Sequence, residues 1–135
     1  MSVDTLIEDF SFLENWEDRY KYLIELGNQL QHLSDDQKID EWKIAGCQSQ
    51  VWIIPHIEKD RIYFEGDSDA IIVRGIISIV FEIFKDKSEL EILDIDVEEI
   101  FDKMGLREHI TPNRRSGMLS MVDKIKYYAN EALKV

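Results

Sequence analysis

Apolar residues near the N-terminus recur at the spacing of an amphipathic helix. Leu6, Phe10 and Leu13 share one face of a predicted short opening helix. A second helix is predicted to begin after Asn15, because an asparagine side chain suits the N-cap position and the apolar spacing resumes beyond it. The polar segment 32–41 predicts a loop.

The apolar pattern then changes to the period of a strand. Residues 42–44 alternate as a short strand does, and the runs 51–57 and 61–65 are rich in β-branched residues on either side of a polar turn. The two longer runs predict a β-hairpin. Pro55 cannot donate a hydrogen bond to a sheet, so it predicts an edge strand or a bulge.

The segment 71–84 is apolar on nearly all sides, which predicts a buried helix rather than a surface one. Ser68 or Asp69 is expected to cap it. Gly75 lies inside the helix, where glycine costs about 1 kcal/mol relative to alanine, so a close packing contact is expected there.

Two further helices are predicted towards the C-terminus. Asp96 begins a sequence like a capping box, Gly105 suits a left-handed helix stop, and Thr111 with Pro112 suits the start of the last helix. Together these elements predict an α+β fold for a single domain over residues 1–135. It would have two helices, a small antiparallel sheet, and three helices, the central one packed across the sheet.

Composition narrows the classes of partner. Sixteen Lys and Arg against 28 Asp and Glu give a net charge of −12 over 135 residues. This excess of negative charge argues against nucleic acid and against anionic membrane surfaces. The N-terminus resembles neither a secretory signal nor a transit peptide, so a cytoplasmic location is expected. One cysteine and three scattered histidines argue against an internal disulfide and a zinc site, and neither a metal nor a cofactor is expected.

The cysteine, Cys47, lies between the polar loop and the first strand of the hairpin. It is either a buried thiol that packs as a small apolar side chain or a nucleophile, which needs a nearby cation or N–H groups to favour the thiolate. The sequence offers four candidate cations: Arg74, His109, Arg114 and Arg115. Segment 66–69 lacks the ligand pattern of a calcium loop and is better explained as a turn.

Four separated motifs carry a family resemblance. GCQSQVW at 46–52, GDSDA at 66–70, IVRG at 72–75 and LREHITPNR at 106–114 occur in order, and the similarity runs from about Leu6 to Ala132. In these motifs the chain resembles the SufE family of sulfur-acceptor proteins.

The resemblance implies a fold related to the IscU-type scaffold and a relay of sulfur for iron–sulfur cluster assembly. The donor would be a pyridoxal-phosphate cysteine desulfurase of the SufS or CsdA type, and the recipient a SufBCD-type scaffold. Cys47 matches the acceptor position, with Gly46 and Gln48 beside it and Asp69 and Arg114 expected nearby. The protein would activate the desulfurase rather than act as a stand-alone enzyme, and would carry no cofactor of its own. A homodimer is left open.

Two other interpretations stay open at this stage. The chain is alternatively a binding module that regulates a partner allosterically, with Cys47 in a structural role. A thiol hydrolase is less favoured because no base or oxyanion motif accompanies Cys47. If Cys47 is the acceptor, we expect apolar neighbours to shield it until the donor docks.

Overall fold

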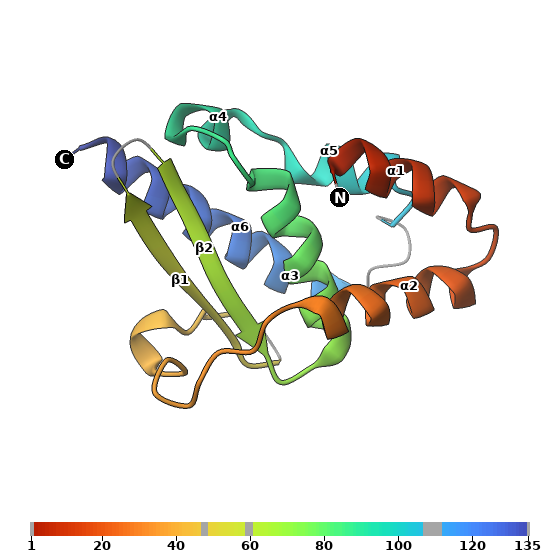
Figure 1. Cartoon of the computed structure of the whole chain (residues 1–135), viewed down its shortest axis with the longest axis horizontal. Coiled ribbons are helices and arrows are strands. Elements are labelled where there is room, and N and C mark those ends of the chain that lie inside the picture. The colour runs from red at the N-terminus through yellow and green to blue at the C-terminus, as the bar shows by residue number, and fades with distance from the viewer. Residues whose placement is uncertain (1, 47–48, 59–60, 107–111, 135) are drawn as a thin grey trace.

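The computed structural model describes residues 2–46, 49–58, 61–106 and 112–134. Figure 1 shows helices gathered on one side of a β-hairpin, with the longest helix running behind it. The elements in chain order are α1 (Val3–Phe12), α2 (Trp16–Gln29), a 3-10 turn (Asp40–Trp42), β1 (Val51–Glu58), β2 (Arg61–Ser68), α3 (Ile71–Phe84), α4 (Glu89–Asp94), α5 (Val97–Lys103) and α6 (Pro112–Leu133).

Local signals set most of the helix ends. The Asn15 side chain accepts a hydrogen bond from the N–H of Asp18 at 2.9 Å, which confirms the predicted N-cap of α2. Asp96 caps α5 in the same way, and Gly105 has the positive φ, 71°, expected of a helix stop. Helix α4 was not predicted, because its six residues are too few to show an apolar period.

β1 and β2 form an antiparallel hairpin in which Val51 lies opposite Ser68 and Glu58 opposite Arg61. Pro55 lies in β1, which is consistent with the expected edge position, because among the described residues the far edge of β1 carries a single bridge, from Lys43 to Trp52. The strand predicted at 42–44 is therefore reduced to this one bridge. The N–H groups of Trp42 and Lys43 bond to carbonyls three residues earlier and close a turn instead.

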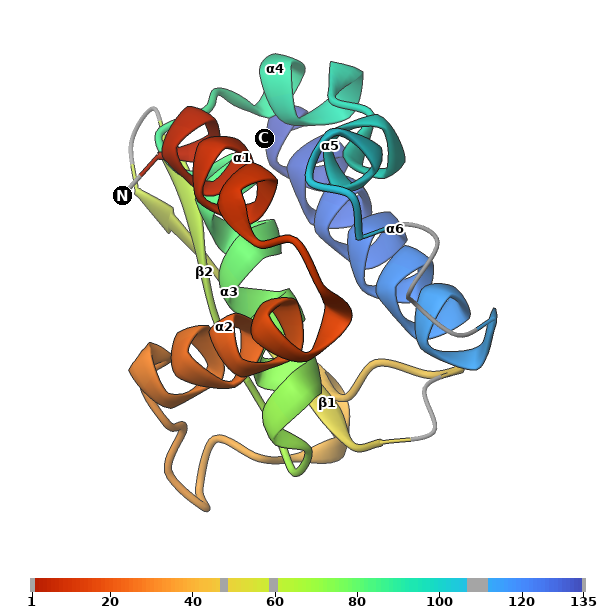
Figure 2. The ribbon, with the colours of Figure 1, turned by 90° about the vertical axis from the view of Figure 1, so that its right-hand side faces the viewer.

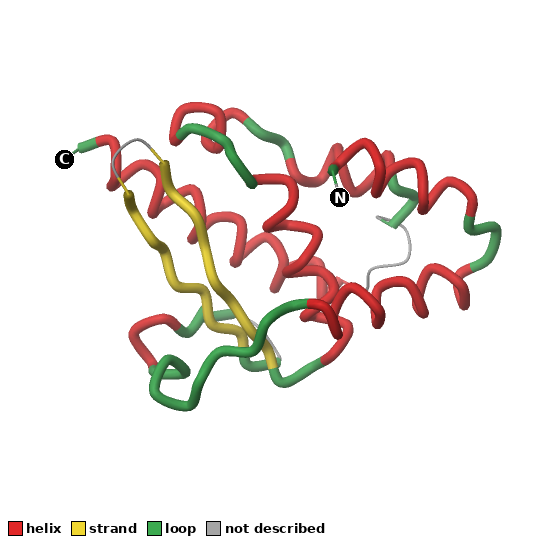
Figure 3. Tube along the Cα trace, in the orientation of Figure 1, coloured by secondary structure: helices red, strands yellow, loops and turns green. Residues whose placement is uncertain are grey.

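The two faces of the hairpin are covered by different parts of the chain. One face contributes Val51, Ile53 and Ile62 to the main core, and both α3 and α6 contact the strands there. The opposite face is covered by residues of the segment between α2 and β1, as detailed below. Figure 3 shows that segment as loop with a short helical turn, running beside one end of the strands.

Helix α3 passes through the middle of the molecule with α2 against one side and α6 beside it (Figure 2). The contact between α2 and α3 is made backbone to backbone at two glycines. A Cβ on Gly75 would lie 2.2 Å from the carbonyl oxygen of Leu23, and one on Gly27 would lie 2.4 Å from that of Ile71. The predicted close contact at Gly75 is confirmed, since no larger residue fits there.

Within the described part of the chain, no helix combines the length and the apolar character needed to cross a bilayer.

Candidate functional site

Hydrogen bonds hold the described residues on both sides of Cys47. Cys47 and Gln48 themselves lie outside the described residues. On the N-terminal side, the Ile44 N–H donates to the Val51 carbonyl at 2.8 Å. Gly46 has a φ of 83°, in the left-handed region that favours glycine, and a Cβ there would lie 3.1 Å from Ser120 Oγ. The chain at Gly46 therefore lies directly beside α6.

Asp69 holds the C-terminal side of the same segment. The Gln50 N–H donates to Asp69 Oδ1 at 3.0 Å, and the Asp69 N–H donates back to the Gln50 carbonyl at 3.3 Å. The expectation that Ser68 or Asp69 caps α3 is wrong. Ala70 occupies the N-cap position, where its methyl side chain cannot accept a hydrogen bond, and the Asp69 carboxylate accepts from Gln50.

A buried ion pair lies two residues before Asp69. Asp67 is fully buried and Arg74 is 3% exposed, and Arg74 Nη1 donates to Asp67 Oδ1. Arg74 also donates through Nε to the Gly27 carbonyl at 3.0 Å and through Nη2 to the Leu30 carbonyl. Because these carbonyls lie at the C-terminal end of α2, the guanidinium supplies the positive charge that a helix C-terminus favours.

This pair gives Arg74 a different role from the one considered from sequence. Arg74 was a candidate cation for the Cys47 thiolate, but its donors are directed to Asp67 and the end of α2. A sequence signal for the pair does exist: an arginine inside an apolar helix needs a buried acceptor, and burial of an unpaired charge is costly.

The other predicted cations lie on α6 or outside the described residues. Arg114 is partly buried on the first turn of α6. Arg115 is paired with Glu98, to which its Nε donates at 2.7 Å. His109 falls outside the described residues, as does the geometry of any cation relative to Cys47.

Comparison with known proteins identifies the family. The model of the SufE family, described as an Fe-S metabolism associated domain, matches residues 4–129. The chain belongs to the SufE family. An uncharacterized SufE-like protein of Rhizobium meliloti is 46% identical, over 98% of this chain and 97% of its own. A second, from Rhizobium etli, is 46% identical over 93% of this chain and 87% of its own.

The fold is shared with a solved structure. The solution structure of a hypothetical protein from Thermus thermophilus superimposes with a TM-score of 0.78 at 17% identity, and both chains are covered completely. This likeness confirms the α+β fold predicted from sequence, and the SufE family places the protein in iron–sulfur metabolism.

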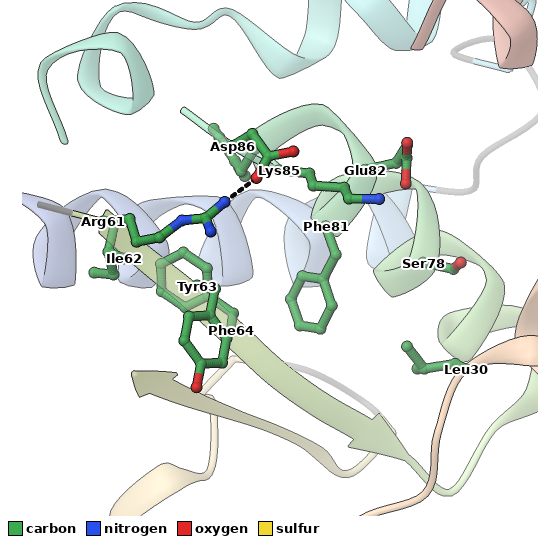
Figure 4. Close-up of a pocket in the computed structure, with 11 residues that line it drawn as sticks. Leu30, Arg61, Ile62, Tyr63, Phe64, Ser78, Phe81, Glu82, Lys85 and Asp86 are labelled. Atoms are coloured by element: carbon green, nitrogen blue, oxygen red, sulfur yellow. Dashed lines mark hydrogen bonds and ion pairs between the residues drawn. The ribbon is translucent and has the colours of Figure 1, made fainter. Parts of the chain in front are cut away.

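A separate groove of about 380 Å³ lies between the start of β2 and the end of α3 (Figure 4). Its floor includes Phe64 and Phe81, whose rings lie 6.3 Å apart. The groove is lined by both basic and acidic side chains, and Arg61 forms an ion pair with Asp86. The groove lies at the end of β2 opposite to Asp69, so it is not part of the Cys47 segment of this SufE-family chain.

The described residues of this SufE-family chain contain no cluster of three or more His, Cys, Asp or Glu side chains suited to a metal ion. The two aspartates of segment 66–69 point to different partners: Asp67 to Arg74, and Asp69 to Gln50. Residues 66–68 belong to β2, so the turn expected over 66–69 is confined to the residues that follow Ser68.

The buried pair predicts an acid-sensitive contribution to stability. Burial raises the pKa of Asp67, but hydrogen bonds from the Leu33 and Ser68 N–H groups and the charge of Arg74 outweigh it, so the pKa is lowered. The stabilisation is complete above the unfolded-state pKa of about 4 and is lost as pH falls through the lower folded-state value.

We therefore expect Asp67→Asn to lose about 3 kcal/mol of unfolding free energy at pH 7. The difference in unfolding free energy between variant and wild type, measured by urea unfolding, is expected to narrow as pH falls below about 4, where the unfolded wild-type chain binds a proton on Asp67 that the folded protein does not yet bind. A difference that stays constant between pH 7 and pH 3 would contradict the assignment. Asp86→Asn, in an exposed pair with Arg61, is the control and is expected to change stability by less than about 1 kcal/mol.

Proposed function

We propose that this protein accepts sulfur from a pyridoxal-phosphate cysteine desulfurase on Cys47 and passes it to an iron–sulfur cluster scaffold. The observation that carries the proposal is the GCQSQVW segment, which holds the only cysteine of the chain within a full-length SufE-family match. The two SufE-like relatives and the motifs discussed above support it. A desulfurase of the SufS or CsdA type is the proposed donor, and a SufBCD-type complex the proposed recipient.

The proposed step is a thiol exchange. The Cys47 thiolate attacks the outer sulfur of a persulfide on the desulfurase, and the bond between the two donor sulfurs breaks. The donor cysteine leaves as a thiolate with the electron pair, and Cys47 becomes the persulfide. Charge and electrons balance without an oxidant or reductant.

A single cysteine suits this step. Because the chain has no second thiol, a persulfide on Cys47 cannot be resolved as an internal disulfide and must be handed onward. Cluster assembly on one chain needs several cysteines to hold iron, so one cysteine supports a relay rather than a scaffold. In this proposal Cys47 is shielded until the donor docks, which protects the persulfide from oxidants.

We assign supporting roles to the residues around Cys47. Asp69 holds the segment through Gln50, and the left-handed backbone of Gly46 lets the chain pass close to α6. Arg114, on the first turn of α6, is proposed to favour the thiolate or to hold the segment. Gln48, next to Cys47, is included on the motif alone.

The proposal is tested by the rate at which a cysteine desulfurase turns over cysteine. Addition of this protein is expected to raise the turnover rate saturably in the presence of a reductant that clears Cys47. No increase with any SufS- or CsdA-type desulfurase shown to be active would contradict it. An allosteric binding module would also raise turnover, and the Cys47→Ser variant distinguishes the two, as argued in the Discussion.

Loss of the Asp69 carboxylate is expected to affect sulfur uptake more than stability. Asp69→Ala removes the acceptor of the Gln50 N–H, and we expect the rate of sulfur uptake to fall about tenfold. Unfolding free energy is expected to fall by only about 1 kcal/mol, since the hydrogen bond is exposed. Uptake by mass spectrometry and urea unfolding measure the two effects.

Asp69→Asn is the matched control, because its amide oxygen can still accept from Gln50 and uptake is expected near the wild-type rate. If Asp69→Ala unfolds the domain, or leaves uptake unchanged, Asp69 has no specific part in transfer.

A further inference from the structure

The segment between α2 and the Cys47 position, residues 30–43, is here called the strap. It contains no regular element longer than the 3-10 turn Asp40–Trp42. Leu33 and Trp42 of the strap pack on Trp52 and Ile54, which face outward from β1. The strap then continues into Ile44, which bonds to Val51. The strap therefore leads, through Ile44, into the segment that carries Cys47 in the sequence.

The strap is held by polar groups that converge on Asp67. The Leu33 N–H donates to Asp67 Oδ2 at 3.0 Å, and Lys38 Nζ lies 3.5 Å from the same oxygen and 5.6 Å above the Trp52 ring. Arg74 bonds to the Leu30 carbonyl, where the strap begins. His32 Nδ1 lies 2.9 Å from Arg74 Nη1 and 3.3 Å from Asp67 Oδ2.

The two oxygens of Asp67 face different parts of the chain. Oδ2 accepts from the strap, whereas Oδ1 accepts from the Ser68 N–H at 2.8 Å and from Arg74. Ser68 begins the turn that carries Asp69, the residue that holds Gln50. The Asp67 carboxylate thus links the strap, which precedes Cys47 in the sequence, to the turn whose Asp69 bonds to Gln50, which follows Cys47.

We propose that Asp67 and Arg74 are positioning residues for Cys47. Arg74 locks the Asp67 carboxylate and the end of α2 together, and Asp67 sets the strap and the Asp69 turn relative to each other. The inference rests on the proposed function, in which Cys47 must meet a donor persulfide in a fixed geometry. A buried ion pair is weak evidence for stability alone, so a role in specifying one arrangement of the chain accounts for its presence here.

The test measures amide hydrogen exchange in Asp67→Asn by NMR. An asparagine has one acceptor oxygen, so it cannot serve both the strap and the Asp69 turn. We expect the Leu33 amide and the distant Gln50 amide both to exchange at least fivefold faster than in wild type. Asp86→Asn, which removes a carboxylate from the exposed pair with Arg61, is expected to leave both rates unchanged.

Two functional measurements accompany the exchange rates. In Asp67→Asn, iodoacetamide is expected to alkylate Cys47 about threefold faster, and sulfur uptake to slow about tenfold with less than a twofold change in KM for the desulfurase. If Asp67→Asn does not fold, Arg74→Lys replaces it. Lysine keeps a positive charge near Asp67 but lacks the guanidinium donors that bond to the Gly27 and Leu30 carbonyls. The changes in amide exchange, alkylation and sulfur uptake are therefore expected at about half the size.

The outcomes separate this inference from the proposed function. Faster exchange at Leu33 alone, with Gln50 exchange, alkylation and uptake unchanged, would show that the pair only fastens the strap, and would overturn the inference. If wild-type protein takes up no sulfur, the proposed function fails, while Gln50 exchange and Cys47 alkylation still decide whether Asp67 positions the segment.

Discussion

Cys47→Ser is expected to abolish both sulfur uptake and stimulation of the desulfurase, with uptake reduced at least 100-fold. A serine oxygen cannot take the place of sulfur in a persulfide, and a hydroxyl is far less ionised than a thiol at neutral pH. The substitution exchanges sulfur for oxygen and changes little else. We therefore expect the affinity for the desulfurase to stay within about twofold of wild type.

Affinity and turnover measured on the same desulfurase separate the two candidate roles. A relay predicts binding without stimulation for Cys47→Ser. An allosteric binding module predicts that the variant binds and stimulates as the wild type does, and that result would contradict the relay. Cys47→Ala serves as a second variant, because it removes the hydroxyl as well and is expected to behave like Cys47→Ser.

Gly75→Ala is expected to be the most destabilising single-methyl change in the α2–α3 contact, at about 3 kcal/mol or more. A Cβ at this position would lie 2.2 Å from the carbonyl oxygen of Leu23, and backbone cannot move aside as a side chain can. The gain of about 1 kcal/mol in helix propensity is outweighed by the separation of α2 from α3. That separation also draws the Gly27 carbonyl away from Arg74.

Urea unfolding of Gly75→Ala checks this expectation, with Ser78→Ala on the same helix as the control. Ser78 is only partly buried and its substitution introduces no new atom against backbone, so its effect is expected within about 1 kcal/mol. Equal stability of Gly75→Ala and wild type would show that α2 and α3 tolerate a wider separation than the structure has.

The helices and the hairpin were predictable because their signals are local. The apolar spacing of 71–84 and the cap at Asn15 depend only on neighbouring residues, and both predictions are confirmed. Helix α4 was not predicted because it is short, although the sequence contains the capping box that Ser88 and Glu91 form at its start. The strand predicted at 42–44 is reduced to a bridge between Lys43 and Trp52, because the N–H groups of Trp42 and Lys43 make tight-turn hydrogen bonds.

The site was less predictable because its contacts are distant in sequence. An aspartate at position 69 suits a helix cap by local rules, and only the folded chain brings Gln50 to it. Local rules likewise make Arg74 a candidate cation for Cys47, and only the folded chain brings the carbonyls of Gly27 and Leu30 to its donors. The motifs indicated which residues belong to the site, whereas their pairings required the structure.

The most direct test of the account is the intact mass of the wild-type protein after incubation with an active cysteine desulfurase and cysteine. We predict a gain of about 32 Da for each added sulfur, reversed by a thiol reductant and absent in Cys47→Ser. The absence of any sulfur adduct with SufS-type and CsdA-type desulfurases, each shown to turn over cysteine, would contradict the assignment of Cys47 as a sulfur acceptor.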